Sequence, residues 1–189
     1  MIARIAALLL ILATVAGCAS YGPTRSTEAE VAALARTLQA LSREVDPAEA
    51  TAAARLSFAT TADLARAYQI TDPPLIHNAK VNAGQKPRGL CYHWAEDLQA
   101  ALDAAGFRTL ATARAIANAH NPILIDHSTA VIVARGAPME TGVVVDPWRY
   151  GGRLFWSPVR DDTRYDWVPR EQVMREKGRI RYEAAPAVN

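Results

Sequence analysis

The spacing of the apolar residues changes part-way along the chain, and this change limits the possible folds more than any other feature. Up to about residue 105, apolar side chains recur every three or four positions, which is the period of one helix face. Beyond that point, β-branched or alternating apolar residues typical of strands occupy 107–118, 127–135 and 142–148. Helices followed by hairpin-linked strands predict an α+β domain, with N-terminal helices packed on an antiparallel β-sheet.

Two helices are predicted near the start of the domain. Thr27 and Glu30 match a capping box, which would begin the first helix. The apolar face of that helix carries Val31, Leu34, Leu38, Leu41 and Val45. Asp46 can cap a second helix and Pro47 is tolerated in its first turn, so this helix should run to about Tyr68.

A long loop is then expected, followed by a third helix that starts with a cysteine. Prolines and glycines interrupt the segment 71–89, which predicts a loop of a length that is often functional. From Leu90 to Ala105 the pattern is helical again, and Gly106 provides a stop. Cys91 therefore lies in the first helical turn, where unpaired N–H groups and the helix dipole favour an anion such as a thiolate.

The first 20 residues, MIARIAALLLILATVAGCAS, have the layout of a secretory signal. Arg4 precedes an apolar run from Ile5 to Val15, and small residues precede Cys18. The run is short for a membrane span, which needs about 20 apolar residues. An ordinary signal peptide and a single membrane anchor are the alternatives.

The ending VAGC of this segment resembles the lipobox of bacterial lipoproteins. The resemblance implies that residues 1–17 are removed and that Cys18 is lipidated. Residues 18–26 would then form a polar tether ahead of a globular domain, 27–189. Multiple acyl chains would hold the protein on a membrane. Ala19 stands where Asp favours retention in the inner membrane, which implies the periplasmic face of the outer membrane.

The charge balance and length describe one modest domain. Removing 17 of the 189 residues leaves 172, enough for a single buried core. Arg4 is the only charged residue removed, so 20 of the 21 basic residues remain against 19 acidic ones. This near-neutral balance indicates no nucleic-acid partner. No internal repeat or second domain is visible.

With Cys18 acylated, Cys91 has no partner for a disulfide, although the compartment is oxidising. A free cysteine can pack as a small buried hydrophobe, or it can be a nucleophile. His127 begins one predicted strand and Asp146 lies near the end of the next. Because a hairpin pairs these strands antiparallel, we expect the two side chains to be neighbours. Asp126, directly before His127, is the alternative acid.

Three segments together resemble the papain-like superfamily, and within it the transglutaminase-like cysteine peptidases and amidases. They are GLCYHWAEDL, DHSTAVIV and VVVDPW, in the family's order and within about a third of the chain, 85–148. The resemblance implies a papain-like (transglutaminase-like) fold and a catalytic triad of Cys91, His127 and Asp146. Tyr92 replaces the tryptophan often found after the nucleophile, and no glutamine directly precedes the cysteine.

Gln85, six residues before the nucleophile, resembles the side-chain donor of the papain oxyanion hole, and the backbone N–H of Cys91 or Tyr92 is a second candidate donor. Gln85 can equally be a solvated loop residue. The resemblance implies a membrane-anchored thiol hydrolase that cleaves peptide or isopeptide amides of an envelope substrate through a thioester. Acyl transfer by the same triad and a non-catalytic envelope scaffold are the alternatives.

The remaining histidines and aromatic residues suggest packing more than chemistry. His93 should face away from Cys91 on its helix, and His120 is predicted to lie in a turn. His77 lies in the expected loop, where such a residue is usually solvated. With one available cysteine and no tight histidine cluster, we expect neither a metal site nor a cofactor. Five aromatic residues follow Asp146 and should close the core or line a cleft: Trp148, Tyr150, Trp156, Tyr165 and Trp167.

Overall fold

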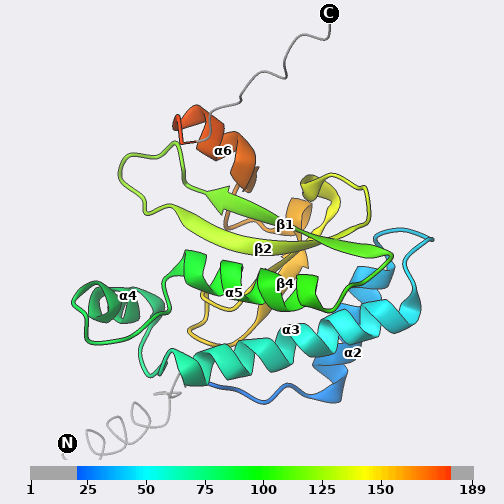
Figure 1. Ribbon diagram of the computed structural model, residues 1–189, viewed down its shortest axis with the longest axis horizontal. Coiled ribbons are helices and arrows are strands. Elements are labelled where there is room, and N and C mark those ends of the chain that lie inside the picture. The colour runs from blue at the N-terminus through cyan, green and yellow to red at the C-terminus, as the bar shows by residue number, and fades with distance from the viewer. Residues whose placement is uncertain (1–20, 180–189) are drawn as a thin grey trace, which may run out of the picture.

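The computed structural model describes residues 21–179, which form an α+β domain (Figure 1). Within these residues four helices precede the first strand and one follows the last. They are α2 (Glu28–Gln39), α3 (Pro47–Ala67), α4 (Pro74–Asn82), α5 (Cys91–Ala104) and α6 (Arg170–Glu176). The α+β class and the order of helices before strands, both expected from the sequence, are confirmed.

The strands form one antiparallel sheet with the order β4-β3-β2-β1-β5. Their bounds are β1 (Leu110–Ala117), β2 (His127–Ala134), β3 (Val143–Asp146), β4 (Phe155–Pro158) and β5 (Val168–Pro169). Short 3-10 helices, Met139–Thr141 and Val159–Asp161, follow β2 and β4. Because β2 and β3 pair antiparallel, the start of β2 lies beside the end of β3.

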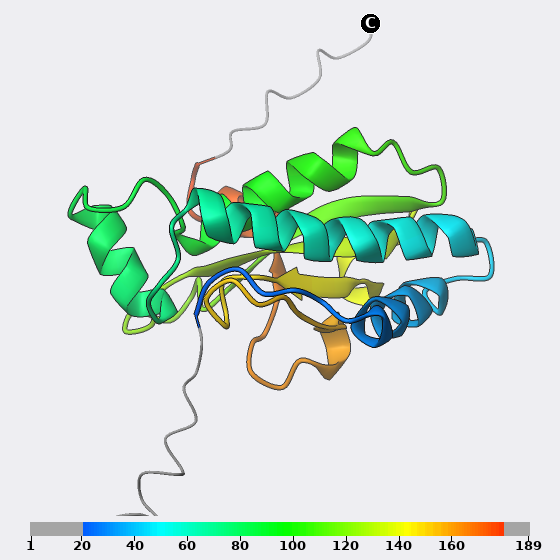
Figure 2. The same cartoon turned by 90° about the horizontal axis from the view of Figure 1, so that it is seen from below.

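Helices cover one face of the sheet (Figure 2). α5 packs on β1 and β2, α3 packs against α5, and α2 packs against α3. Buried side chains of this layer include Leu34, Leu38, Leu98, Leu102, Ile132 and Val145. On the opposite face, Val131 and Val144 pack against Val159 and Trp167, which come from the chain beyond β4. The alternation of β2 between two buried faces explains why its sequence is apolar throughout.

The first two helix starts are confirmed in detail. The Thr27 hydroxyl accepts from the Glu30 N–H at 3.2 Å, and the Glu30 carboxylate accepts from the Thr27 N–H at 2.8 Å. This reciprocal pair is the capping box expected at the start of α2. The Asp46 carboxylate accepts from the Ala48 N–H at 2.7 Å and caps α3.

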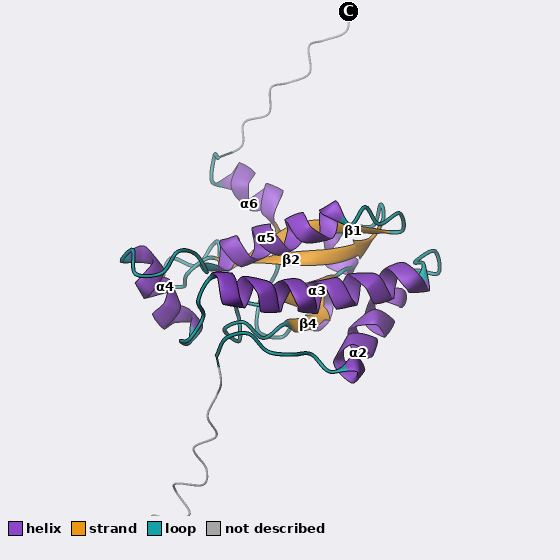
Figure 3. Cartoon of the chain, turned by 60° about the horizontal axis from the view of Figure 1, so that its bottom comes forward, coloured by secondary structure: helices purple, strands orange, loops and turns teal. Residues whose placement is uncertain are grey.

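The loop expected over 71–89 was wrong in its first half, which forms α4. Pro74 takes the first helical turn, where its missing N–H removes no hydrogen bond, and the residues that follow are ordinary helix formers. His77, expected to be solvated, is 1% exposed. Its Nε2 lies 2.8 Å from the Arg88 carbonyl oxygen, and this contact fastens α4 to the segment leading into α5. Figure 3 shows α4 and the loop that joins it to α5.

Gly89 occupies the tightest point of this segment. Its φ of +123° is a conformation that side chains rarely adopt. A Cβ at this position would lie 2.4 Å from His77 Nε2, so only glycine lets the chain pass this close to α4. The indole N–H of Trp94 donates to the Gly89 carbonyl at 3.0 Å. The segment that leads into α5 is therefore fixed by contacts with His77 of α4 and with Trp94 of α5, and these contacts also fix the position of Cys91.

The predicted signal 1–17 and Cys18 lie outside the described residues. Within the predicted tether, Gly22 is described, and its N–H donates to the Gly151 carbonyl at 2.8 Å. In the range 21–179, no helix is long and apolar enough to cross a membrane.

Candidate active site

Cys91 is the first residue of α5. His93 sits two residues later and turns its Nδ1 back toward the loop, where it accepts from the N–H groups of Gly89 and Leu90 at 3.3 Å each. His93 thus caps the helix and is not placed as a base. The N–H groups of the first helical turn have no partner inside the helix, so Cys91 and Tyr92 present free donors close to the thiol.

His127 and Asp146 are neighbours, as the hairpin argument predicts. His127 Nε2 lies 2.7 Å from Asp146 Oδ2, and both residues are at most 2% exposed. The register brings Ala130 opposite Val145, which places Asp146 opposite Thr129, and His127 lies two residues before Thr129 on the same face of the sheet, within reach of the carboxylate. The carboxylate therefore holds the ring with a proton on Nε2, which leaves Nδ1 for another partner.

The Cys91 thiol is close enough to His127 to contribute to the raised pKa of the ring, and Nδ1 is the ring nitrogen that Asp146 leaves free. His127 Nδ1 is buried without a hydrogen-bond partner among the described residues, while the thiol donates to the Asp126 carbonyl at 3.6 Å. Burial opposes a charged ring, but Asp146 and then Cys91 outweigh it and raise the pKa of His127 to about 9. At neutral pH this arrangement favours an imidazolium facing the sulfur.

Arg149 extends the pair into a buried network that the sequence did not indicate. Its Nε donates to Asp146 Oδ2 at 3.1 Å and its backbone N–H to Oδ1 at 3.1 Å. Its two terminal nitrogens donate to Asp162 at 3.1 and 2.6 Å, and the indole N–H of Trp167 donates to Asp162 at 2.9 Å. With His127 protonated, two cations and two anions are buried together and the network is neutral.

These charges also act on the acid of the pair. Burial opposes a charged carboxylate, but His127 and then Arg149 hold the pKa of Asp146 below its ordinary value. Asp146 is therefore ionised at neutral pH even though it is buried. The three-residue spacing from Asp146 to Arg149 was a possible signal in the sequence, but the partner Asp162 comes from a distant turn.

Aromatic rings enclose the imidazole. Trp148, Tyr165 and Trp167 have their ring centroids 4.6, 4.8 and 5.3 Å from that of His127. Two other aromatic residues that were expected to close the core have separate positions: Trp156 packs against Phe58, and Tyr150 is exposed. The rings around His127 exclude water from the face of the base, which strengthens its interaction with Asp146.

The alternative residues do not join the site in the same way. The Asp126 carboxylate pairs with Lys177 at 2.5 Å, and only its backbone carbonyl contacts the thiol. His120 is exposed and pairs with Glu176. Gln85 is exposed in the turn after α4, and its role as an oxyanion donor stays a prediction. Within residues 21–179, no group of three or more His, Cys, Asp or Glu is placed to hold a metal ion.

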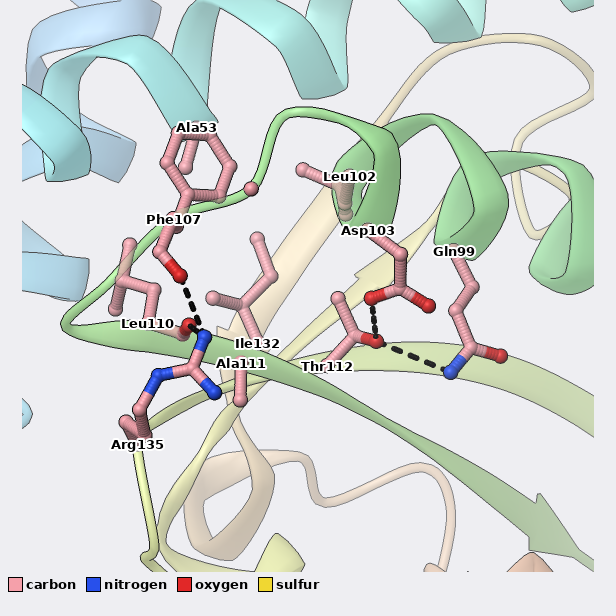
Figure 4. A pocket seen from close by; sticks show the side chains of 11 residues that line it. Ala53, Gln99, Leu102, Asp103, Phe107, Leu110, Ala111, Thr112, Ile132 and Arg135 are labelled. Carbon is pink, nitrogen blue, oxygen red and sulfur yellow. Dashed lines mark hydrogen bonds between the residues drawn. The ribbon is translucent and has the colours of Figure 1, made fainter.

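Two cavities flank α5, one at each end. The first, of about 310 Å³, opens onto Cys91 and is bounded by α5, β1 and α6. The second, of about 220 Å³, lies beyond the C-terminal half of α5 (Figure 4). Its polar groups satisfy one another, because Thr112 bonds to Asp103 and Gln99. The cavity with the thiol is the candidate substrate site.

The described geometry thus brings Cys91, His127 and Asp146 to one end of the sheet, and of these three residues Cys91 lines the cavity. Comparison of the chain with protein-family models, curated proteins and solved structures found no match.

The pKa of His127 can be measured directly. We expect its ring to titrate at about 9 in NMR spectra of the histidine-labelled full-length chain. In Asp146→Asn the ring should titrate well below 9, because the negative charge that offsets the effect of burial on the imidazolium is removed. Asp161→Asn, an exposed carboxylate next to the network, is the control and should leave the titration unchanged. An unaltered His127 titration in Asp146→Asn would contradict the assigned pair.

The raised pKa of His127 also makes the free energy of unfolding depend on pH. The ring pKa is raised from 6.5 to about 9 on folding, so protonated His127 stabilises the fold fully below pH 6.5. This contribution is lost as the pH rises through about 9.

The buried network predicts a large difference between two arginine substitutions. Arg149→Gln should lower the free energy of unfolding by about 3–5 kcal/mol, because Asp146 and Asp162 would remain buried without their shared cation. Arg160→Gln, an exposed arginine nearby, should change it by less than about 0.5 kcal/mol. Denaturant unfolding of both variants measures the difference, and equal losses would show that Arg149 does not hold the network together.

Proposed function

We propose that this protein is a thiol hydrolase that cleaves peptide or isopeptide amide bonds with Cys91, His127 and Asp146. The observation that carries the proposal is a free cysteine in the first turn of a helix, beside a buried imidazole whose far nitrogen is held by a carboxylate. A packing cysteine needs no such partner. The pairing of nucleophile, base and orienting acid is the general signature of covalent catalysis.

Each step of the reaction has a group in this site. The Cys91 thiolate attacks the amide carbonyl carbon, and the oxygen that becomes negative is stabilised by N–H groups of the first turn of α5. His127, protonated, gives its proton to the leaving nitrogen as the C–N bond breaks, which releases an amine and leaves a thioester. Water then loses a proton to His127 and attacks the thioester, which releases the carboxylic acid and restores the Cys91 thiolate and the His127 imidazolium.

The raised pKa of His127 supports its part as the acid. An imidazolium with a pKa of about 9 is still protonated at neutral pH, when the leaving amine needs its proton. Asp146 keeps the ring oriented throughout, because it is itself held by Arg149. Gln85 stays a candidate second donor for the oxyanion.

The order of the three residues, a helix followed by two antiparallel strands, supports the papain-like and transglutaminase-like assignment of the fold. Acyl transfer is the close variant, in which an amine in place of water reaches the thioester. A non-catalytic envelope scaffold is the alternative of a different class. The raised pKa of His127 and its buried partners favour chemistry over a scaffold, because packing alone does not require them.

We also propose that the protein is a lipoprotein at the periplasmic face of the outer membrane, acting on a peptide or protein of the envelope. This rests on the VAGC sequence and on Ala19 after the cysteine. An enzyme on such an anchor meets substrates in a narrow layer next to the membrane.

The triad can be tested by single and double substitutions. Cys91→Ala and His127→Ala should each lower kcat/KM for a peptide amide by about 10³-fold or more, and the double variant should be little worse, because the residues act as a unit. His120→Ala, which removes an exposed histidine, should retain activity. Turnover assays with water alone and with an added amine would separate hydrolysis from acyl transfer.

Two results would count against the enzyme. Activity that survives in Cys91→Ala would exclude the thiol as nucleophile. A parent protein that is inactive and whose Cys91 resists an alkylating reagent near neutral pH would favour the scaffold.

The anchor predicts the behaviour of the N-terminal cysteine. Cys18→Ser should block incorporation of labelled lipid and release the protein from the membrane fraction, while thermal unfolding of the domain stays the same, because Cys18 precedes the packed residues. Cys91→Ser is the matched control and should remain membrane-bound. Membrane association of Cys18→Ser equal to that of the parent, with no lipid incorporated in either, would refute the lipoprotein assignment.

A further inference from the structure

The cavity over Cys91 carries more positive charge than the proposed reaction requires. Its walls include three arginines, Arg114 from β1, Arg170 from α6 and Arg179 beyond it, together with the carboxylates of Glu96 and Asp126. Its volume of about 310 Å³ is sufficient for a small side chain next to the thiol.

Both carboxylates in this wall have a cationic partner outside it, whereas among the described residues no carboxylate lies within ion-pair distance of Arg114 or Arg170. Asp126 pairs with Lys177 at 2.5 Å, and Glu96 lies 3.7 Å from Arg88. The uncompensated charge in the cavity is therefore positive.

Arg114 is the arginine held in the most defined position. It is partly buried on β1, and one terminal nitrogen donates to the Ser128 hydroxyl at 3.0 Å and to the Tyr92 carbonyl at 3.4 Å. Its Nε is buried and has no hydrogen-bond partner among the described residues. The two oxygen acceptors of Arg114 therefore leave part of the hydrogen-bonding capacity of its guanidinium unused in a wall of the cavity.

The other cavity shows what a structurally satisfied arginine looks like in this protein. Arg135 donates to the backbone carbonyl of Arg108 and to those of Phe107 and Leu110, the last two of which are drawn in Figure 4. Arg114 lacks this set of acceptors. Burial and then the nearby charge of Arg170 lower the pKa of Arg114, and the smaller opposing effects of Glu96 and Cys91 do not cancel them.

We propose that Arg114, assisted by Arg170, binds a carboxylate of the substrate next to the amide bond that Cys91 attacks. The substrate class is thus a peptide or isopeptide with an acidic group beside the scissile bond, either an acidic side chain or a terminal carboxylate. The planar guanidinium of arginine binds carboxylates through paired N–H groups, so arginine recognises a carboxylate more specifically than lysine does. This inference rests on the proposed function, since it specifies the substrate of the same site.

Arg114 has a second possible role, because it also contacts the Tyr92 carbonyl beside the nucleophile. If Arg114 served only to hold α5 in place, its loss would weaken the binding of acidic and neutral substrates equally. The ratio of the affinities for an acidic peptide and for its neutral isostere therefore separates carboxylate recognition by Arg114 from a structural role.

A binding experiment that needs no turnover tests the proposal. The full-length chain carrying Cys91→Ala would be titrated by NMR with N-acetylated tetrapeptide amides that have Glu at one position, each matched by the same peptide with Gln, and with peptides that end in a free carboxylate or an amide. We expect at least one acidic or carboxylate-ended peptide to bind about tenfold more tightly than its neutral match. The two peptide sets distinguish a side-chain carboxylate from a terminal one.

Arg114→Gln should abolish this preference and Arg170→Gln should reduce it, while Arg43→Gln, which removes an exposed charge in the turn between α2 and α3, should leave it intact. Thermal unfolding shows which variants are folded. If Arg114→Gln does not fold, the carboxylate preference of Arg170→Gln decides whether the proposal stands. No binding, no preference for the carboxylate, or a preference unchanged in both cavity variants would overturn the proposal. Failure of the enzyme mechanism would show separately, as a wild-type chain that binds acidic peptides but never hydrolyses them.

Discussion

The burial of the Asp146 carboxylate is the constraint on which the candidate site depends. A charge that is 1% exposed is costly, and here it is offset by hydrogen bonds from His127 and Arg149. Arg149 would itself be an uncompensated buried cation without Asp162. The orientation of His127 therefore depends on four charged groups from β2, β3 and the turns that follow β3 and β4, and removing any one leaves the others with an unpaired charge.

The nucleophile is placed by a different kind of constraint, the close packing of backbone. Gly89 passes against His77 of α4 at a distance that no side chain would allow, and Trp94 and His93 bond back to the same segment. These contacts determine where α5 begins, so the helix dipole and its free N–H groups act at Cys91. The thiol and the imidazole are thus held by separate parts of the fold that meet at one end of the sheet.

Much of this arrangement could be predicted because it depends on local patterns. Cap residues, the alternating strand pattern and the hairpin between β2 and β3 were sufficient to place His127 beside Asp146. The strand β4 and the helix α4 were missed. β4 has only four residues of mixed character, and two adjacent prolines before α4 looked like an interruption when Pro74 in fact lies in its first turn.

The sequence by itself determined that helices precede the antiparallel strands, the place of Cys91 in a first helical turn and the adjacency of His127 and Asp146. These follow from contacts between residues that are close in the chain or joined by one hairpin. Only the tertiary structure decided that Arg149 bridges Asp146 to Asp162, that aromatic rings enclose His127, and that Arg114 and Cys91 line the same cavity. Such partners come from separate elements, and because their pairing depends on how those elements pack, no local pattern records it.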